Sequence, residues 1–269
     1  MKPQFRKMIP FLMAALLFVQ TMPATFAAAS DSSEITVSFR LIGDTFHEGG
    51  VIGHGEYVTW IPTTLYTVEA GATVGDVFLT AIEEHGMKQK GAASGYVEAV
   101  QAPAVLGGYW LGEFDNGSNS GWMYTINGDH PGVGLTNRAL KDGDEIVWHY
   151  VDDYVLEERD PNSVYYGRWL EAADITPQEY LWQSCKLERT GRESCLLSMA
   201  AVPENLLIIV AGYHETGQMA DCQVITRSDL SWEPGTVAEK AVSVQGKTAA
   251  AFVLDGDTCA LIRVLEHDS

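Results

Sequence analysis

The order of hydrophobic patterns along the chain restricts its fold more than any other feature. Residues 34–151 contain several short segments in which apolar and polar residues alternate, with one helical pattern among them. In the first segment, Ile35, Val37, Phe39 and Leu41 alternate with polar or small neighbours, which is typical of a half-buried strand. Strands on both sides of a single helix predict an α+β domain in which the helix lies across one face of a mixed sheet, as in a β-grasp fold.

The helical pattern begins at Thr73 and ends at Gly86. Thr73 can cap the first amides of a helix, and Asp76 three residues later completes a capping-box pattern. Gly86 can adopt the left-handed conformation that ends many helices. Apolar residues recur between them at helical spacing along one face, namely Val74, Val77, Phe78, Ala81 and Ile82.

The other strands of this domain are predicted from β-branched and aromatic residues. Residues 58–61 form one such segment, which we expect to end at Pro62, and a separate short strand follows at residues 66–68. Residues 122–127 and 145–151 are predicted to form a strand pair, because turn sequences follow the first strand and precede the second. The first domain is therefore expected to cover residues 34–153.

The C-terminal part of the chain has a different pattern. Periodicity is lost between residues 152 and 177, so residues 154–190 are interpreted as a joint that is partly packed through its aromatic residues. Residues 191–269 then show short strand patterns at regular spacing, which predict a small all-β, immunoglobulin-like sandwich. The expected strands cover residues 196–201, 206–213, 220–226, 237–244, 249–254 and 259–265.

The first 29 residues have the pattern of a signal peptide for export. Three basic residues come first, an apolar stretch over residues 9–19 follows, and small residues surround a cleavage site between Ala28 and Ser30. A transmembrane helix needs about 20 apolar residues, which is more than this stretch contains. We therefore expect an extracellular or cell-surface protein with no transmembrane segment after cleavage.

Charge restricts the kind of partner. The whole chain has a formal net charge of −19, and removal of the three basic residues at its N-terminus makes the mature form more acidic still. Nucleic acids and anionic membranes select basic surfaces, so neither is expected as a partner.

The four cysteines all lie in the last third of the chain, at positions 185, 195, 222 and 259. In an oxidising compartment they are compatible with one or two disulfides, and the sequence leaves the pairing open. There is no Cys-x-x-Cys pair and the histidines are scattered, so no metal site is predicted. His47, Glu48, His54 and Glu56 lie close together in the sequence, but the glycines among them exclude a helix and favour a polar loop.

Catalysis is not expected either. The serines between Gly117 and Gly121 lack the Gly-x-Ser-x-Gly spacing of a nucleophile elbow and precede a strand, whereas an elbow joins a strand to a helix.

Aromatic residues near glycines are the best candidates for ligand contacts. Tyr109 and Trp110 lie in a glycine-rich segment, where backbone can approach a ligand closely and leave a ring exposed. Gly121 and Trp122 begin a predicted strand beside it. We predict these four residues as the ligand-binding set, and expect Tyr124 and Trp148 to belong to the core.

Three segments carry a family resemblance. Residues 116–128 read Asn-Gly-Ser-Asn-Ser-Gly-Trp-Met-Tyr-Thr-Ile-Asn-Gly, residues 140–146 read Leu-Lys-Asp-Gly-Asp-Glu-Ile, and residues 71–78 form the helix entry. Together they resemble the domain that forms the C-terminal half of transcobalamin and intrinsic factor and that also occurs in exported bacterial proteins. In the vertebrate carriers this domain closes over one side of cobalamin, and an all-helical barrel holds the other side. Here the chain instead continues into a sandwich that is similar to β-domains of bacterial surface proteins.

The sequence thus predicts an exported, non-catalytic binding module without a bound cofactor of its own. The resemblance implies cobalamin or a related corrinoid as a small-molecule ligand. The alternative is a surface adhesion, interaction or spacer protein that binds extracellular proteins or glycans.

Overall fold

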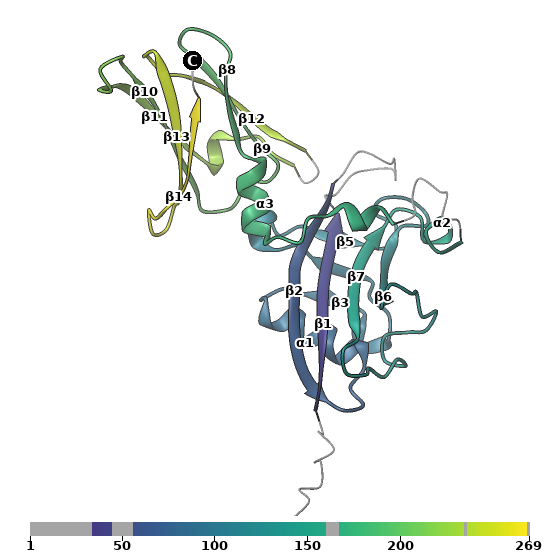
Figure 1. The fold of residues 1–269 in the computed structure, drawn as a ribbon. Coiled ribbons are helices and arrows are strands. Elements are labelled where there is room, and N and C mark those ends of the chain that lie inside the picture. The colour runs from purple at the N-terminus through teal and green to yellow at the C-terminus, as the bar shows by residue number, and fades with distance from the viewer. Residues whose placement is uncertain (1–33, 45–55, 160–166, 234–235, 268–269) are drawn as a thin grey trace, which may run out of the picture. The chain divides into compact units, whose positions relative to one another are not determined.

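The computed structural model describes residues 34–44, 56–159, 167–233 and 236–267 (Figure 1). The predicted signal peptide and the sequence cluster of His47, Glu48 and His54 lie outside the described residues. The fold is mostly β, with several sheets, which is consistent with a sandwich. In the part of the chain that the structure describes, no helix combines the length and the apolarity that crossing a membrane requires.

The first sheet has four strands in the order β2-β1-β7-β6. They are β1 (Glu34–Asp44), β2 (Tyr57–Glu69), β6 (Gly121–Ile126) and β7 (Glu145–Val151). β1 pairs antiparallel with β2 and parallel with β7, and β6 pairs antiparallel with β7. The sheet is therefore mixed, as predicted, and β6 is one of its edge strands.

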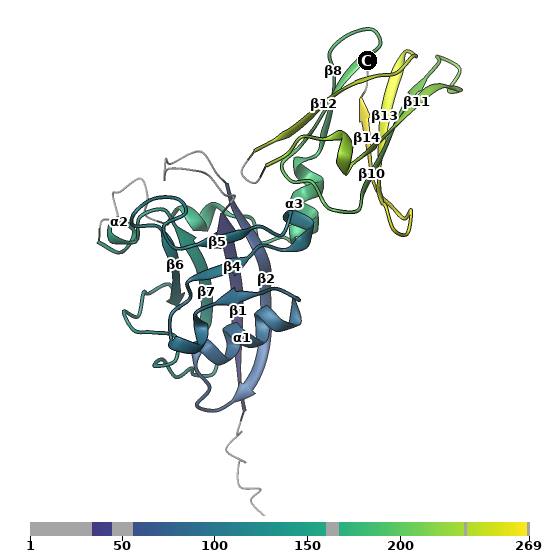
Figure 2. The same cartoon turned by 180° about the vertical axis from the view of Figure 1, so that it is seen from behind.

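One face of this sheet is covered by the helix and by a smaller sheet (Figure 2). The helix α1 spans Val74–Glu84. The smaller sheet contains β3 (Gln89–Lys90), β4 (Ala99–Gln101) and β5 (Trp110–Gly112), in that order. Single turns of 3-10 helix lie on either side of β4, at η1 (Ala92–Ser94) and η2 (Ala104–Leu106).

The prediction of α1 is confirmed in its details. The Thr73 hydroxyl accepts a hydrogen bond from the Asp76 amide at 3.3 Å, and the Thr73 amide donates to the Asp76 carboxylate at 2.7 Å. Gly86 has the expected positive φ, at 62°. The apolar face of the helix packs on the sheet, where the Phe78 and Trp148 ring centroids are 4.6 Å apart.

The opposite face of the sheet is covered in part by the chain that follows β7. Val147 and Val151 of β7 form a second buried cluster with Trp169 and Ala172. Trp169 belongs to η3 (Arg168–Glu171), a 3-10 turn that follows the short helix α2 (Tyr154–Arg159). Trp169, one of the aromatic residues expected to pack this joint, is buried, whereas its neighbour Leu170 is exposed.

Two predictions about prolines are wrong. β2 does not end at Pro62 but continues through it, because β2 is an edge strand and the register with β1 shifts there, so the missing amide interrupts no ladder. Pro177 does not belong to an irregular joint either. It is the first residue of α3 (Pro177–Ser184), whose capping box is formed by Thr176 and Glu179.

Two further sheets are built from the C-terminal part of the chain. Each of the six predicted strands corresponds to an observed strand, and one strand before them was not predicted. One of these C-terminal sheets has the strand order β12-β9-β8, and the other has the order β11-β10-β13-β14. The strands are β8 (Lys186–Arg189), β9 (Ser194–Met199), β10 (Leu206–Tyr213), β11 (Met219–Thr226), β12 (Ala238–Ser243), β13 (Thr248–Asp255) and β14 (Leu261–His267), with a 3-10 turn η4 (Arg227–Asp229) after β11.

All four cysteines are free thiols in the structure. Cys185 and Cys195 are buried, while Cys222 and Cys259 are exposed. The disulfides with which the sequence is compatible are therefore not formed.

Candidate ligand-binding site

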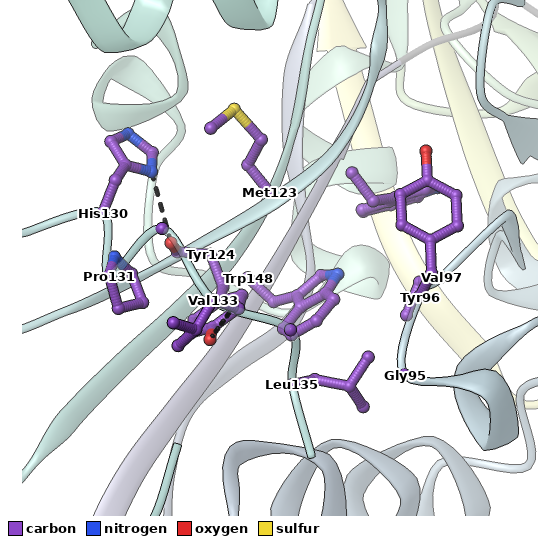
Figure 3. A pocket seen from close by; sticks show the side chains of 13 residues that line it. Gly95, Tyr96, Val97, Met123, Tyr124, His130, Pro131, Val133, Leu135 and Trp148 are labelled. Carbon is purple, nitrogen blue, oxygen red and sulfur yellow. Dashed lines mark hydrogen bonds between the residues drawn. The ribbon is translucent and has the colours of Figure 1, made fainter. Parts of the chain in front are cut away.

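A cavity of about 260 Å³ lies at the outer edge of β6 (Figure 3). Its walls come from β6, from the loop that follows it, from residues 95–97 and from Trp148 of β7. The lining residues are mostly apolar: Gly95, Tyr96, Val97, Trp122, Met123, Tyr124, His130, Pro131, Gly132, Val133, Gly134, Leu135 and Trp148.

Short polar contacts hold the loop against β6. The Tyr124 hydroxyl donates a hydrogen bond to the carbonyl of Val133 at 2.7 Å. The Nδ1 atom of His130 lies 3.2 Å from the Tyr124 carbonyl. At the far side of the loop, a Cβ added to Gly134 would lie only 3.1 Å from the Gly95 carbonyl oxygen, so a glycine allows the two segments to approach closely.

Some main-chain groups of β6 point outward along this edge. The Asn127 amide donates a hydrogen bond to the Glu145 carbonyl, so these two residues are a hydrogen-bonded pair of the antiparallel ladder. Such pairs recur at every second residue of β6. The main-chain groups of Trp122 and Tyr124 consequently point away from β7. Among the described residues, the only bridge on this outer edge of β6 joins Ile126 to Asp129.

The walls differ in exposure. Trp122, Tyr124 and Trp148 are at most 8% exposed, and the Tyr124 and Trp148 rings are stacked with centroids 4.9 Å apart. Tyr96 and Val133 are 47% and 46% exposed and form the accessible rim. Burial, and then a hydrogen bond to Glu113, raises the pKa of Tyr96 to about 12, so this phenol is uncharged at neutral pH. The rim therefore offers uncharged, mostly apolar surface.

The structure brings only part of the predicted ligand-binding set to this cavity. Trp122 lines it, and Gly121 is adjacent, because a Cβ at Gly121 would lie 3.9 Å from the Tyr96 hydroxyl. Tyr109 lies outside the walls, packs edge-on against Trp60 and donates a hydrogen bond to the Asp44 carbonyl.

Trp110 also lies outside the cavity. Its neighbour Leu111 in β5 is fully buried, so by strand alternation Trp110 faces the other way. The Lys90 ammonium lies 4.4 Å from the centre of its ring. One face of the predicted stacking residue is thus occupied by a cation of the protein itself.

Sequence reasoning missed the loop over residues 130–135, which forms half of the cavity. Its Pro131, Gly132 and Gly134 indicate an irregular loop but not where that loop lies. The hydrogen bond from Tyr124 to Val133 holds the loop against β6, and the sequence pattern does not indicate that bond.

Three polar residues form a largely buried cluster at the start of this loop. His130, His149 and Glu157 each have one potential ligand atom within 4.8 Å of the others. Burial, and secondarily the neighbouring His130, lowers the pKa of His149 to about 3, while a hydrogen bond to the Val147 carbonyl opposes this shift. His149 is therefore neutral at physiological pH and can act as a metal ligand.

Residues 71–152 match the family described as "Domain of unknown function (DUF4430)". This range contains α1, the smaller sheet, β6, β7 and every residue that lines the cavity. No curated protein matches the chain.

Proposed function

We propose that this protein is an exported, non-catalytic binding module that holds a flat, largely apolar ligand in the cavity beside β6. The observation that carries the proposal is the composition of the cavity, in which aromatic rings form the floor and uncharged side chains form the rim. Ligand sites in proteins are typically apolar concavities with a few polar groups that orient the ligand. Here the His130 ring and the outer main-chain groups of β6 provide those groups.

A corrinoid is the ligand class that the resemblance to transcobalamin supports. The arrangement of α1 across one face of a mixed sheet is in keeping with the β-grasp-like domain of that family. A cavity of about 260 Å³ is much smaller than a corrin ring system. We therefore expect one edge of the ligand to enter the cavity, while the rest lies over Tyr96 and Val133.

Equilibrium dialysis against hydroxocobalamin, read by visible absorption, tests this function. We expect Tyr96→Ala to weaken binding by about tenfold, as for the loss of roughly 1–2 kcal/mol of aromatic contact. Trp110→Ala is the matched control, because it also removes an aromatic ring but lies outside the cavity walls. Loss of binding in Trp110→Ala alone would instead place the ligand on β5, and absence of binding to the wild type would reject the corrinoid.

The alternative of a surface interaction protein is favoured by the outer edge of β6. The outward main-chain groups of Trp122 and the outward amide of Tyr124 can pair with an extended peptide as an additional strand. This function predicts slower hydrogen exchange of the two amides when an extracellular protein partner is bound. It also predicts no binding of hydroxocobalamin.

Export is proposed from the N-terminal sequence. Intact-mass measurement of protein recovered from culture medium should give a mature N-terminus between Ala28 and Ser30. Recovery of only the uncleaved mass from cells would contradict export.

A further inference from the structure

We propose that His130, His149 and Glu157 bind a divalent transition-metal ion such as Zn²⁺. His130 also lines the cavity, whereas His149 and Glu157 do not, so metal binding measured without the proposed ligand tests this proposal separately. The three residues come from separate elements, namely the loop after β6, strand β7 and helix α2. Folding of the segment after β7 back over the sheet brings them together.

The distances leave a gap between ligand atoms. The potential ligand atoms lie within 4.8 Å of one another, and His130 Nε2 lies 3.8 Å from Glu157 Oε1. That separation is too long for a direct hydrogen bond, which requires about 2.7–3.2 Å. Ligands in a tetrahedral zinc site, with bonds of about 2.0–2.2 Å, are closer together than 4.8 Å, so metal binding requires a modest contraction of the cluster.

The hydrogen bonds of both imidazoles direct Nε2 towards the site. Nδ1 of His149 lies 3.2 Å from the Val147 carbonyl, and Nδ1 of His130 lies at the same distance from the Tyr124 carbonyl. A carbonyl oxygen can only accept, so Nδ1 must carry the proton in each ring. A neutral ring with its proton on Nδ1 presents a lone pair at Nε2, which is the usual arrangement of metal-binding histidines.

His149 provides the most direct indication of a missing ligand. Its side chain is 0% exposed, and its Nε2 atom has no hydrogen-bond partner among the described residues. Buried polar atoms of native proteins are nearly always paired, so an unpaired ring nitrogen in a histidine that clusters with a carboxylate and a second imidazole requires an explanation. A metal ion would supply the missing partner of His149 Nε2 and would use the free lone pairs of the other two groups.

Glu157 is oriented as a metal ligand would be. It is 1% exposed, its Oε1 accepts a hydrogen bond from the Trp169 indole at 2.7 Å, and its Oε2 accepts one from the Gly167 amide at 2.8 Å. These bonds fix the carboxylate while leaving lone pairs on its oxygens. Carboxylates that bind metals are commonly held by such outer hydrogen bonds.

The ligand set indicates the class of metal. Two imidazoles and one carboxylate suit Zn²⁺ and related ions such as Co²⁺ or Ni²⁺, whereas Ca²⁺ and Mg²⁺ prefer oxygen ligands alone. Three protein ligands also leave one coordination position for water or another small ligand.

Titration with Co²⁺, followed by its visible absorption, tests the site directly. His47 and His54 should be replaced by Gln in every protein used, so that these histidines outside the described residues cannot bind the ion. We expect this background protein to bind one equivalent of Co²⁺ and to release it to Zn²⁺. His130→Gln and Glu157→Gln should weaken binding by at least about tenfold, since even the loss of an outer-shell partner commonly costs that much.

His85→Gln is the matched control, because His85 is exposed at the end of α1 and away from the cluster. It should bind Co²⁺ like the background protein. His149→Gln is also expected to lose binding, but this fully buried residue can affect folding, so the two other variants decide the question once circular dichroism shows that they are folded. Unchanged Co²⁺ binding in both, or no binding by the background protein, would overturn the proposal.

Discussion

The rings of His149 and Trp169 are stacked, with centroids 4.2 Å apart and planes inclined by 19°. His149 belongs to β7, whereas Trp169 follows in the segment after α2, so this contact fastens that segment to the sheet. The Trp169 indole also donates to Glu157, which links the same segment to α2. One tryptophan thus covers the proposed metal site and closes the second face of the first sheet.

Replacing Trp169 should loosen this segment. Trp169 is 6% exposed, so we expect Trp169→Ala to lower the free energy of unfolding by about 3–5 kcal/mol, as large core truncations do. Its neighbour Leu170 is 65% exposed, and Leu170→Ala should change stability by less than about 0.5 kcal/mol. Urea denaturation measures both. Limited proteolysis between residues 152 and 177 should be faster only in Trp169→Ala, and equal rates would show that Trp169 does not hold the segment.

Trp148 should contribute more to stability than Trp110, because Trp148 belongs to the core. Trp148 is 3% exposed and packs against Phe78 of α1 and Tyr124 of β6. We expect Trp148→Ala to destabilise the fold by about 3–5 kcal/mol. Trp110→Ala should have a much smaller effect on the melting temperature, because Trp110 is only half-buried and the Lys90 ammonium lies over one face of its ring. A reversed order of the two melting temperatures would contradict this assignment of core and surface.

The hydroxyl of Tyr124 should contribute to the cavity through the loop that it holds. Tyr124→Phe removes the hydrogen bond to Val133 and should cost about 0.5–1.5 kcal/mol of stability. Tyr66→Phe is the matched control, since the buried Tyr66 hydroxyl has no hydrogen-bond partner among the described residues. Thermal melts should show a loss for Tyr124→Phe and no loss for Tyr66→Phe. Equal effects would mean that the bond to Val133 is not what holds the loop.

The cysteines should differ in reactivity under native conditions. Burial raises the pKa of the Cys185 thiol to about 11, so very little of it is thiolate at pH 8. Cys222 and Cys259 are exposed and should react rapidly with Ellman's reagent, while Cys185 and Cys195 should react only after unfolding. Detection of fewer than four thiols after denaturation without reductant would show that a disulfide forms.

Local patterns were sufficient to predict much of the first domain. The capping residues and apolar spacing of α1, and the alternation in β7, depend on neighbours in sequence, and both elements were predicted closely. The passage of β2 through Pro62 depends instead on the position of β2 at the edge of the sheet. Only tertiary structure supplies that information.

The same distinction applies to the candidate sites. Because side chains alternate between the two faces of β7, His149 lies on the face opposite to Trp148. A polar residue at this position of a patterned strand indicates that other chain segments cover that face. Its companions His130 and Glu157 lie in an irregular loop and in the predicted joint, where no periodicity indicates their direction. The cavity was only partly predicted for the same reason, since Trp122 belongs to a patterned strand but the loop that encloses it does not.

Binding of hydroxocobalamin to the Tyr96→Ala and Trp110→Ala variants, compared with the wild type by equilibrium dialysis, tests the central claim most directly. A flat ligand that enters the cavity beside β6 depends on the accessible rim, so we predict binding that is about tenfold weaker in Tyr96→Ala and unchanged in Trp110→Ala. Wild-type affinity in Tyr96→Ala, with binding lost in Trp110→Ala, would contradict the assignment of the cavity as the ligand-binding site.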